Sequence, residues 1–227
     1  MRALPALVLL ASLLGACAAP APPALTPLPG PAWEERCRSV YPNGDWQFVH
    51  AIEFALADGA GGTAIGVTTL SGGEIACALL TVEGLCVFEA RQPQEGDLDI
   101  RRALPPFDKP GFAAGLLDDV RTIFLPPAGA AVVHGRIGVE PVCRHMGADG
   151  RVSDVLPEAA GCWQIRTYRQ GRGERLLETT TCRPEGPGRI PQQLVLHGLG
   201  RSGYTLRMTL IRAEQGAPST FMTETLR

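Results

Sequence analysis

Hydrophobic and polar residues alternate along most of the chain, and this two-residue period is typical of half-buried β-strands. One predicted strand carries Phe48, Ile52, Phe54 and Leu56 on one side and ends at Asp58-Gly59. The same period predicts further strands over residues 65–69, 74–81, 85–91, 132–139, 151–157, 162–170, 174–182, 192–197 and 204–212. Because glycine-containing turns separate several neighbouring strands, we expect antiparallel hairpins.

One segment in the middle of the chain has a different period. Apolar residues recur there every three to four positions, at Phe112, Leu116, Val120, Ile123 and Phe124. This spacing predicts an amphipathic helix with Asp108 as its N-cap, Pro126-Pro127 as its stop, and Asp118 and Asp119 on its solvent side. A helix inserted into a run of antiparallel strands predicts an α+β fold, in which a curved antiparallel sheet forms an incomplete β-barrel with a helical lid.

The first 17 residues have the pattern of a bacterial lipoprotein export signal. Arg2 supplies a positive charge, residues 4–14 form an apolar run, and Leu14-Gly15-Ala16-Cys17 has the form of a lipobox. The run is shorter than the roughly 20 apolar residues that span a bilayer, so we expect a cleaved signal and a lipidated Cys17. By analogy with lipoproteins that an aspartate after the cysteine retains in the inner membrane, Ala18 predicts anchoring in the outer membrane, facing the periplasm.

The sequence divides into three predicted parts. Residues 1–16 are the signal peptide, and residues 17–32 combine the lipidated cysteine with a tether rich in proline and alanine. Proline fixes φ and removes a backbone donor, which favours a semi-rigid linker over a helix or central strand. Residues 33–227 are enough for one domain with a sizeable core, and a short helix is expected over residues 33–38.

Charge and composition exclude some partners. The chain has 21 basic and 23 acidic residues and a formal net charge of −2, and the two signs are interspersed. This distribution offers no basic stripe for nucleic acid. The chain also has no second apolar run of membrane length, so the membrane is expected as a partner only through the lipid anchor.

Six cysteines remain after Cys17, and in an oxidising compartment they favour disulfides. Six cysteines allow 15 connectivities, but one pair can be predicted from a hairpin. The strands on either side of Gly171-Arg172-Gly173 are expected to join through a three-residue loop. That register places Arg166 opposite Glu178 and Cys162 opposite Cys182, which predicts a disulfide.

The sequence does not predict how the other four cysteines pair. Cys77 and Cys86 lie on one face of a second hairpin but are offset from each other, so small buried hydrophobic residues are one interpretation. Cys143 and His145 share a strand face, and an alternative role for this pair is the binding of a metal ion. No second closely spaced Cys/His pair accompanies them, so no metal is expected, and the pairing of Cys37, Cys77, Cys86 and Cys143 stays open.

The motifs of common enzymes are missing. There is no P-loop, H-E-x-x-H or G-x-S-x-G sequence. Residues 198–203 match G-x-G-x-x-G, but a period-two strand follows at once, which predicts a hairpin loop instead of a dinucleotide site. His50 shares a face with apolar residues and is predicted to be a core histidine. We therefore expect neither an enzyme nor a cofactor.

Three segments, taken in order with the lipobox, resemble the LolA/LolB lipoprotein-carrier superfamily, and more narrowly an uncharacterised LolB-like lipoprotein family. They are residues 79–84 leading into 86–90, the central helical insert containing proline and leucine, and residues 190–196 followed by glycine and 204–208. The resemblance covers residues 46–212. It implies an incomplete antiparallel barrel whose concave face, lidded by helices, holds acyl chains without catalysis.

The resemblance implies a lipid-anchored carrier or acceptor for a lipid, lipoprotein acyl chains or a similar apolar cargo, delivered by a periplasmic carrier protein. Each methylene moved from water into an apolar cavity contributes about 0.8 kcal/mol. A turn containing Val82 and Leu85 matches the loop that inserts cargo into the membrane, although it is shorter and contains Glu83. The alternative is a structural or interaction module of an envelope machine that holds no ligand. The candidates for the cavity lining are Phe54, Leu56, Leu79, Phe88, Phe112, Leu116, Val120, Trp163, Ile165, Leu206 and Met208.

Overall fold

The computed structural model describes residues 21–28, 37, 40–127, 131–158, 161–185, 188–200 and 203–216. Thirteen strands and one long helix make up the described part. They are β1 (Thr26–Pro27), β2 (Trp46–Leu56), β3 (Gly61–Ser71), β4 (Glu74–Leu80), β5 (Cys86–Gln92), β6 (Asp99–Ala103), α3 (Phe112–Phe124), β7 (Ala131–Ile137), β8 (Glu140–Met146), β9 (Arg151–Pro157), β10 (Trp163–Arg169), β11 (Arg172–Glu185), β12 (Gly188–Gly198) and β13 (Tyr204–Gln215).

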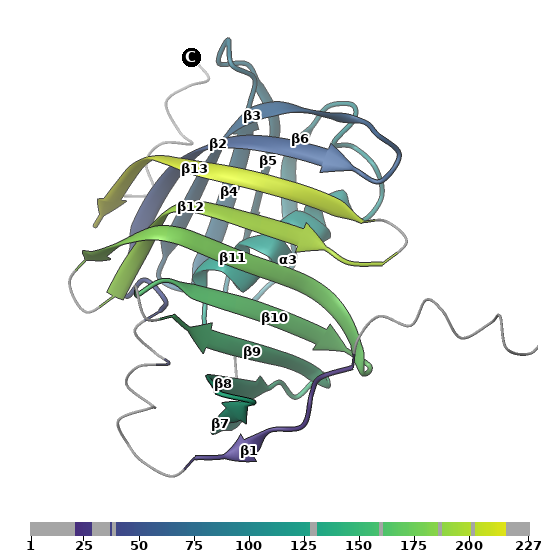
Figure 1. Ribbon diagram of the computed structural model, residues 1–227. Helices are drawn as coiled ribbons and strands as arrows, with labels where there is room; N and C mark the ends of the chain where they lie inside the picture. Colours follow the sequence, from purple (N-terminus) through teal and green to yellow (C-terminus); the bar gives the residue numbers. More distant parts are fainter. Residues whose placement is uncertain are drawn as a thin grey trace, which may run out of the picture.

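All thirteen strands belong to one sheet, in which every neighbouring pair is antiparallel. Its order is β1-β7-β8-β9-β10-β11-β12-β13-β2-β3-β4-β5-β6. Two meanders, β2 to β6 and β7 to β13, therefore meet where β13 pairs with β2. The sheet curls and leaves its end strands β1 and β6 apart (Figure 1). This confirms the predicted α+β fold with an incomplete barrel.

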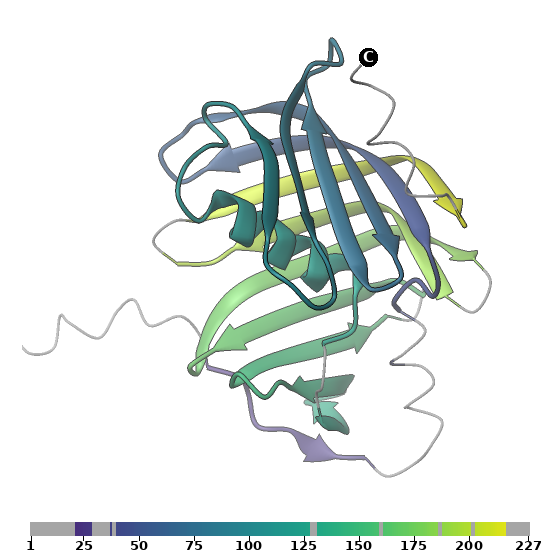
Figure 2. The same cartoon turned by 180° about the vertical axis from the view of Figure 1, so that it is seen from behind.

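Helix α3 connects the two meanders and lies within the curl of the sheet (Figure 2). The alternating pattern of each strand turns one set of side chains towards this helix. Phe48 on β2, Phe88 on β5, Leu177 on β11 and Leu196 on β12 are almost completely buried there. The sequence pattern therefore determines which face of each strand becomes concave, and the helix fills much of the enclosed space.

The bounds of α3 agree with the sequence prediction, but its N-cap does not. Gly111 precedes the helix with φ 81° and ψ −9°, and no side chain caps the first turn. The prediction that Asp108 caps the helix is wrong, because a turn containing Pro110 and Gly111 separates it from Phe112. At the other end Leu125 is extended, as expected for a residue before proline.

The β10–β11 hairpin differs from its predicted register. Its loop is the two-residue turn Gln170-Gly171, with φ 50° and 72°, and Arg169 pairs with Arg172. Positive φ at both central residues is the geometry that suits the right-handed twist of a tight hairpin. The pairing of Arg166 with Glu178 was therefore wrong, and Gln164 lies opposite Glu178 instead.

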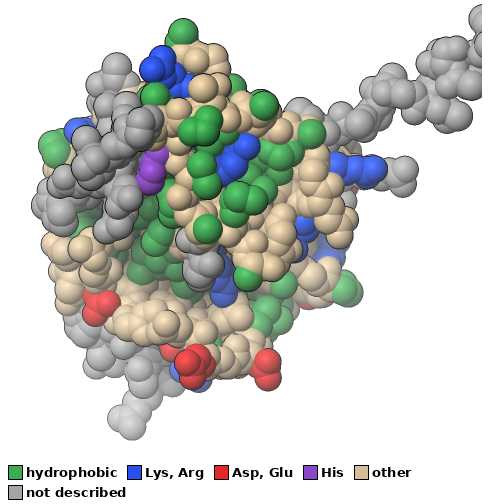
Figure 3. Space-filling view, turned by 90° about the horizontal axis from the view of Figure 1, so that it is seen from below, with side chains coloured by type: hydrophobic (Ala, Val, Ile, Leu, Met, Phe, Trp, Pro, Cys, Tyr) green, Lys and Arg blue, Asp and Glu red, His purple; other side chains and the backbone are tan. Residues whose placement is uncertain are grey.

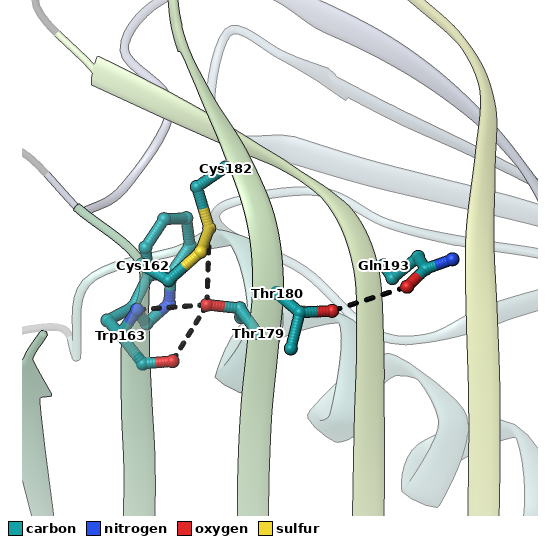
Figure 4. Close-up of a disulfide and its surroundings, with 6 residues drawn as sticks. All are labelled: Cys162, Trp163, Thr179, Thr180, Cys182 and Gln193. Carbon is teal, nitrogen blue, oxygen red and sulfur yellow. Dashed lines mark hydrogen bonds between the residues drawn. A yellow bond between two sulfur atoms is a disulfide. The ribbon is translucent and has the colours of Figure 1, made fainter. Parts of the chain in front are cut away.

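The disulfide predicted from that hairpin is nevertheless present, between Cys162 and Cys182. Thr179 lies beside Trp163, whose backbone N–H donates to the threonine Oγ1 at 2.9 Å (Figure 4). Thr181 has φ 55°, so β11 turns locally just before Cys182. This irregularity lets the two sulfurs meet although the regular register would place Cys162 opposite Thr180.

A second disulfide joins Cys37 to Cys143 across 106 residues. It removes Cys143 from the possible metal ligands, because its sulfur is bonded to another cysteine. Cys77 and Cys86 are free thiols, and Cys77 is buried. Burial raises the pKa of the Cys77 thiol to about 12, so this residue behaves as a small hydrophobic side chain.

Part of the predicted tether lies on the domain. Strand β1 pairs with the edge of β7, and Arg144 donates to the Pro23 carbonyl at 2.9 Å. Proline is tolerated at such an edge because no central ladder is interrupted. The predicted lipidation site, Cys17, lies outside the described residues, as does the predicted helix over 33–38 apart from Cys37.

Candidate functional site

Four phenylalanines form a row that leads from the half-buried Phe54 to the core. Phe54 lies edge-on to Phe107 with ring centroids 6.3 Å apart, and Phe107 lies 5.3 Å from Phe112. Phe112 in turn lies edge-on to Phe88 at 5.2 Å. Phe88 is fully buried, whereas the other three are half-buried. The row therefore connects the solvent to the interior along the amino end of α3.

Sequence analysis identified three members of this row but missed Phe107. The sequence gives little indication of its role, because Phe107 is a lone phenylalanine directly after Leu104-Pro105-Pro106, in a segment without helical or strand periodicity. The loop that carries it is held by hydrogen bonds from the Leu104 N–H to Val87 and from the Phe107 N–H to Leu104. Phe107 thus closes over Phe112 as part of the lid.

Ten of the eleven predicted lining residues contribute to or adjoin this interior. Leu79, Phe88, Val120, Trp163, Ile165 and Met208 are buried in the central apolar cluster. Phe112, Leu116 and Leu206 are half-buried and pack against that cluster. Phe54 lies at the rim in contact with Phe107. Leu56 lies apart at the end of β2 and is 40% exposed.

Glycines in the sheet make room for the large rings. Gly62 on β3 lies under the Phe54 ring, since a Cβ there would come within 3.0 Å of it. Gly198 lies under Tyr204 in the same way, and a Cβ there would clash with the ring. The first glycine of the G-x-G-x-x-G sequence is thus required for packing, and the segment 198–203 connects β12 to β13 as the predicted hairpin loop.

Charged contacts hold the middle of α3 to the sheet, and we call Asp118, Asp119 and their arginine partners the charged flank. Asp119 is only 5% exposed and accepts a hydrogen bond of 2.6 Å from Arg175 Nε on β11. The Tyr204 hydroxyl on β13 donates to the same carboxylate at 2.6 and 2.7 Å. The prediction that Asp119 faces solvent is therefore wrong, because partners distant in sequence cover it.

Asp118 completes this polar contact. It receives two hydrogen bonds from Arg151 on β9, at 2.7 and 2.9 Å, and lies 3.0 Å from the Arg175 guanidinium. Partial burial would raise the pKa of Asp118, but the hydrogen bonds from Arg151 and the charge of Arg175 hold it below its usual value. Two adjacent carboxylates thus bind α3 to three strands.

The carboxyl end of α3 is packed by aromatic residues and one histidine. Phe124 stacks on Phe48 with centroids 4.7 Å apart, and His50 lies 5.8 Å from Phe124. His50 is buried, as predicted from the sequence, and burial lowers its pKa to about 4. It is therefore neutral at ordinary pH and takes part in packing.

A pocket of about 610 Å³ lies beyond this end of the helix. Ile75, Ile165 and Leu125 from the apolar cluster line it, together with Arg121 and Arg151. From below, the molecule shows a hollow where hydrophobic and basic side chains meet (Figure 3). The volume lies in the range of about 300–1,000 Å³ that is typical of small-ligand sites.

The turn between β4 and β5 projects from the body of the sheet (Figure 1). Thr81 shapes it, because its backbone N–H donates to Leu85 and its Oγ1 accepts from the Leu85 N–H. Val82 is 67% exposed and Leu85 is 55% exposed. The two residues that sequence analysis singled out are thus apolar side chains on a protruding tip.

The described residues contain no cluster of three or more metal-binding side chains. Within the same ranges, no helix is long and apolar enough to cross a membrane. The described site thus combines an apolar interior with charged contacts that hold α3 to the sheet.

Comparisons with known proteins identify the fold. No family model and no curated protein matches the sequence. A LolA superfamily protein from Nitrosomonas europaea superposes with a TM-score of 0.53 at 11% identity, over 81% of this chain and 91% of that one. A protein from Vibrio parahaemolyticus, named as an outer membrane lipoprotein-sorting protein domain, gives 0.50 at 11% identity, over 82% and 91%. The chain therefore has the fold of the LolA superfamily, as its sequence resemblance implied.

Proposed function

We propose that this protein is an outer-membrane-anchored periplasmic lipoprotein that binds an apolar cargo, such as a lipid or the acyl chains of a lipoprotein, between α3 and the concave face. The observation that carries this proposal is the phenylalanine row, which runs from Phe54 at the rim to the buried Phe88. A continuous apolar path under a lid favours a flexible hydrocarbon ligand.

The apolar contacts along this path are of a kind that an acyl chain can replace. Phe112 and Leu116 on α3 meet the sheet through apolar contacts only partly removed from solvent. An acyl chain that replaces such contacts keeps apolar surface out of water, so the exchange costs little beyond the ordering of the chain. The charged contacts of Asp118 and Asp119 fix the middle of α3 and limit how far the helix moves.

The remaining parts of the proposal concern the membrane. The lipobox supports a Cys17 anchor, and Ala18 supports the outer membrane as the destination. The exposed Val82 and Leu85 support contact between the β4–β5 turn and the bilayer or a cargo-bearing carrier protein. Transfer between carriers needs no catalytic group, because it can follow a gradient of affinity.

The test is the binding of N-phenyl-1-naphthylamine, a neutral hydrophobic dye, to the soluble Cys17→Ala protein. Leu116→Asp places a charge on the half-buried side of α3 and is expected to weaken dye binding at least tenfold. Ala114→Asp is the matched control, because Ala114 is exposed on the same helix. Folded protein that binds no dye, or binds it equally in both variants, would favour an interaction module without a ligand.

A further inference from the structure

The pocket at the carboxyl end of α3 is lined by side-chain hydroxyl groups from two neighbouring strands. Thr167 on β10 and Ser153 on β9 lie directly opposite each other, and both side chains line the pocket. Thr167 is only 3% exposed, yet its Oγ1 has no hydrogen-bond partner in the described part of the chain. A buried hydroxyl without a partner is costly and calls for an explanation.

Arg121 supplies a positive charge at the same pocket. It lies in the last turn of α3 and donates to the neutral Gln92 side chain on β5. Asp118, one turn earlier, accepts hydrogen bonds from Arg151 and forms an ion pair with Arg175. The guanidinium carries five donors, of which this single hydrogen bond uses one.

Negative groups at the pocket set a condition on any anionic ligand. Asp149 is in the lining, where it accepts the Arg151 backbone N–H and lies 4.0 Å from Arg169. The carboxyl end of a helix is also a weakly negative pole. An anion must therefore be held by side-chain donors, and Arg121 and the Thr167 hydroxyl are placed to supply them.

We propose that this pocket holds the anionic head of an amphiphilic cargo, a carboxylate or phosphate monoester, with Arg121 as its charge partner and the hydroxyls of Thr167 and Ser153 as further donors. Ile75, Ile165 and Leu125 join the pocket to the central apolar cluster, where the hydrocarbon chain lies. The inference rests on the proposed function, because it assigns the head of the same cargo.

The experiment compares three probes of equal chain length, dodecanoate, dodecyl phosphate and dodecanol, in displacing the neutral dye from the Cys17→Ala protein at pH 8. The two anions are expected to bind at least tenfold more tightly than the alcohol, because a charge-assisted hydrogen bond discriminates between them. Arg121→Gln is expected to remove this preference and to leave the affinity for dodecanol unchanged. Arg207→Gln on the exposed outer face of β13 is the matched control.

Thr167→Val separates a binding role from a structural one. The variant is isosteric, and it removes a hydroxyl that has no hydrogen-bond partner among the described residues. We expect affinity for both anions to fall about threefold while the melting temperature stays equal or rises. An anion preference that survives Arg121→Gln overturns the inference but leaves the proposed function standing, whereas failure of all three probes and the dye to bind overturns both.

Discussion

Two sets of contacts hold α3 to the sheet by different physics: an apolar flank around Phe112 at its amino end, and the charged flank of Asp118 and Asp119 at its middle. Towards β5 the contact is aromatic, with Phe112 edge-on to Phe88. Towards β11 and β13 it is ionic, with Asp119 bound by Arg175 and Tyr204. Apolar contacts are non-directional and can be exchanged, whereas a buried carboxylate needs its own partners. The comparison suggests that one flank provides binding surface and the other fixes the position of the helix.

The largest expected effect is on the apolar flank. Phe88→Ala removes a fully buried ring and is expected to lower the free energy of unfolding by about 3–5 kcal/mol. Phe54→Ala, at the half-buried rim of the same row, is expected to cost clearly less. Urea denaturation of both variants checks this order. Equal and small losses would show that the row is not packed around Phe88.

On the charged flank, Arg175→Met leaves Asp119 buried without its cation and is expected to cost about 3 kcal/mol. The double variant Asp119→Leu/Arg175→Met removes both charges and is expected to recover a large part of that loss. The same denaturation measurement decides. Losses of Asp119→Leu and Arg175→Met that simply add in the double variant would mean that the two side chains have no energetic coupling, which would contradict the assigned ion pair.

Lowering the pH is expected to weaken the aromatic end first. Burial lowers the pKa of His50 from 6.5 to about 4. Between these values the unfolded chain binds a proton that the folded chain does not, so stability falls by up to about 3 kcal/mol as the pH drops from 6.5 to 4. The pKa of His145 is lowered by burial as well and adds to the same slope.

On the charged flank, Asp118 responds at lower pH. The pKa of Asp118 lies below its ordinary value of 3.8, so the contribution of Asp118 to stability is present above that pH and is lost below it.

Because the lowered pKa of His50 causes the loss of stability between pH 6.5 and 4, His50→Gln is expected to flatten the pH dependence of the urea midpoint between pH 6.5 and 4.5. His197→Gln on β12 is the control. An unchanged slope in His50→Gln would contradict the assignment.

The smallest effect on stability is expected at the β4–β5 turn. Val82→Ser and Leu85→Ser change exposed side chains and should alter the free energy of unfolding by no more than about 0.5 kcal/mol. Their binding to lipid vesicles, measured by flotation of the Cys17→Ala protein, is expected to fall. Val139 is 89% exposed on a different turn, so Val139→Ser is the control. An equal loss of vesicle binding in this variant would contradict a specific membrane contact by Val82 and Leu85.

The same contrast separates what the sequence predicts from what it does not. The alternation in β2 and the spacing from Phe112 to Phe124 predict elements and buried faces, because these patterns are local. The burial of Asp119 depends on Arg175 and Tyr204, which are 56 and 85 residues away. Neither partner is visible in the helical pattern, so the carboxylate resembled an ordinary solvated residue.

Turn geometry limited the prediction in a second way. Glycines at 171 and 173 indicated a three-residue loop, but Gln170 takes up the left-handed conformation and shortens it. The pairing of Arg166 shifted by two residues as a result, while the disulfide survived because Thr181 adds a local irregularity. Such compensating irregularities depend on the packed structure, and composition does not reveal them.

The measurement that tests the central claim most directly is native mass spectrometry, with organic extraction, of the Cys17→Ala protein secreted into the periplasm. The account predicts that an apolar species copurifies with the Cys17→Ala protein. The same species is expected to be lost when Phe112→Asp is added, while the protein stays folded. A folded protein that is empty, and that takes up no added lipid, would contradict the account and identify the phenylalanine row as a filled core.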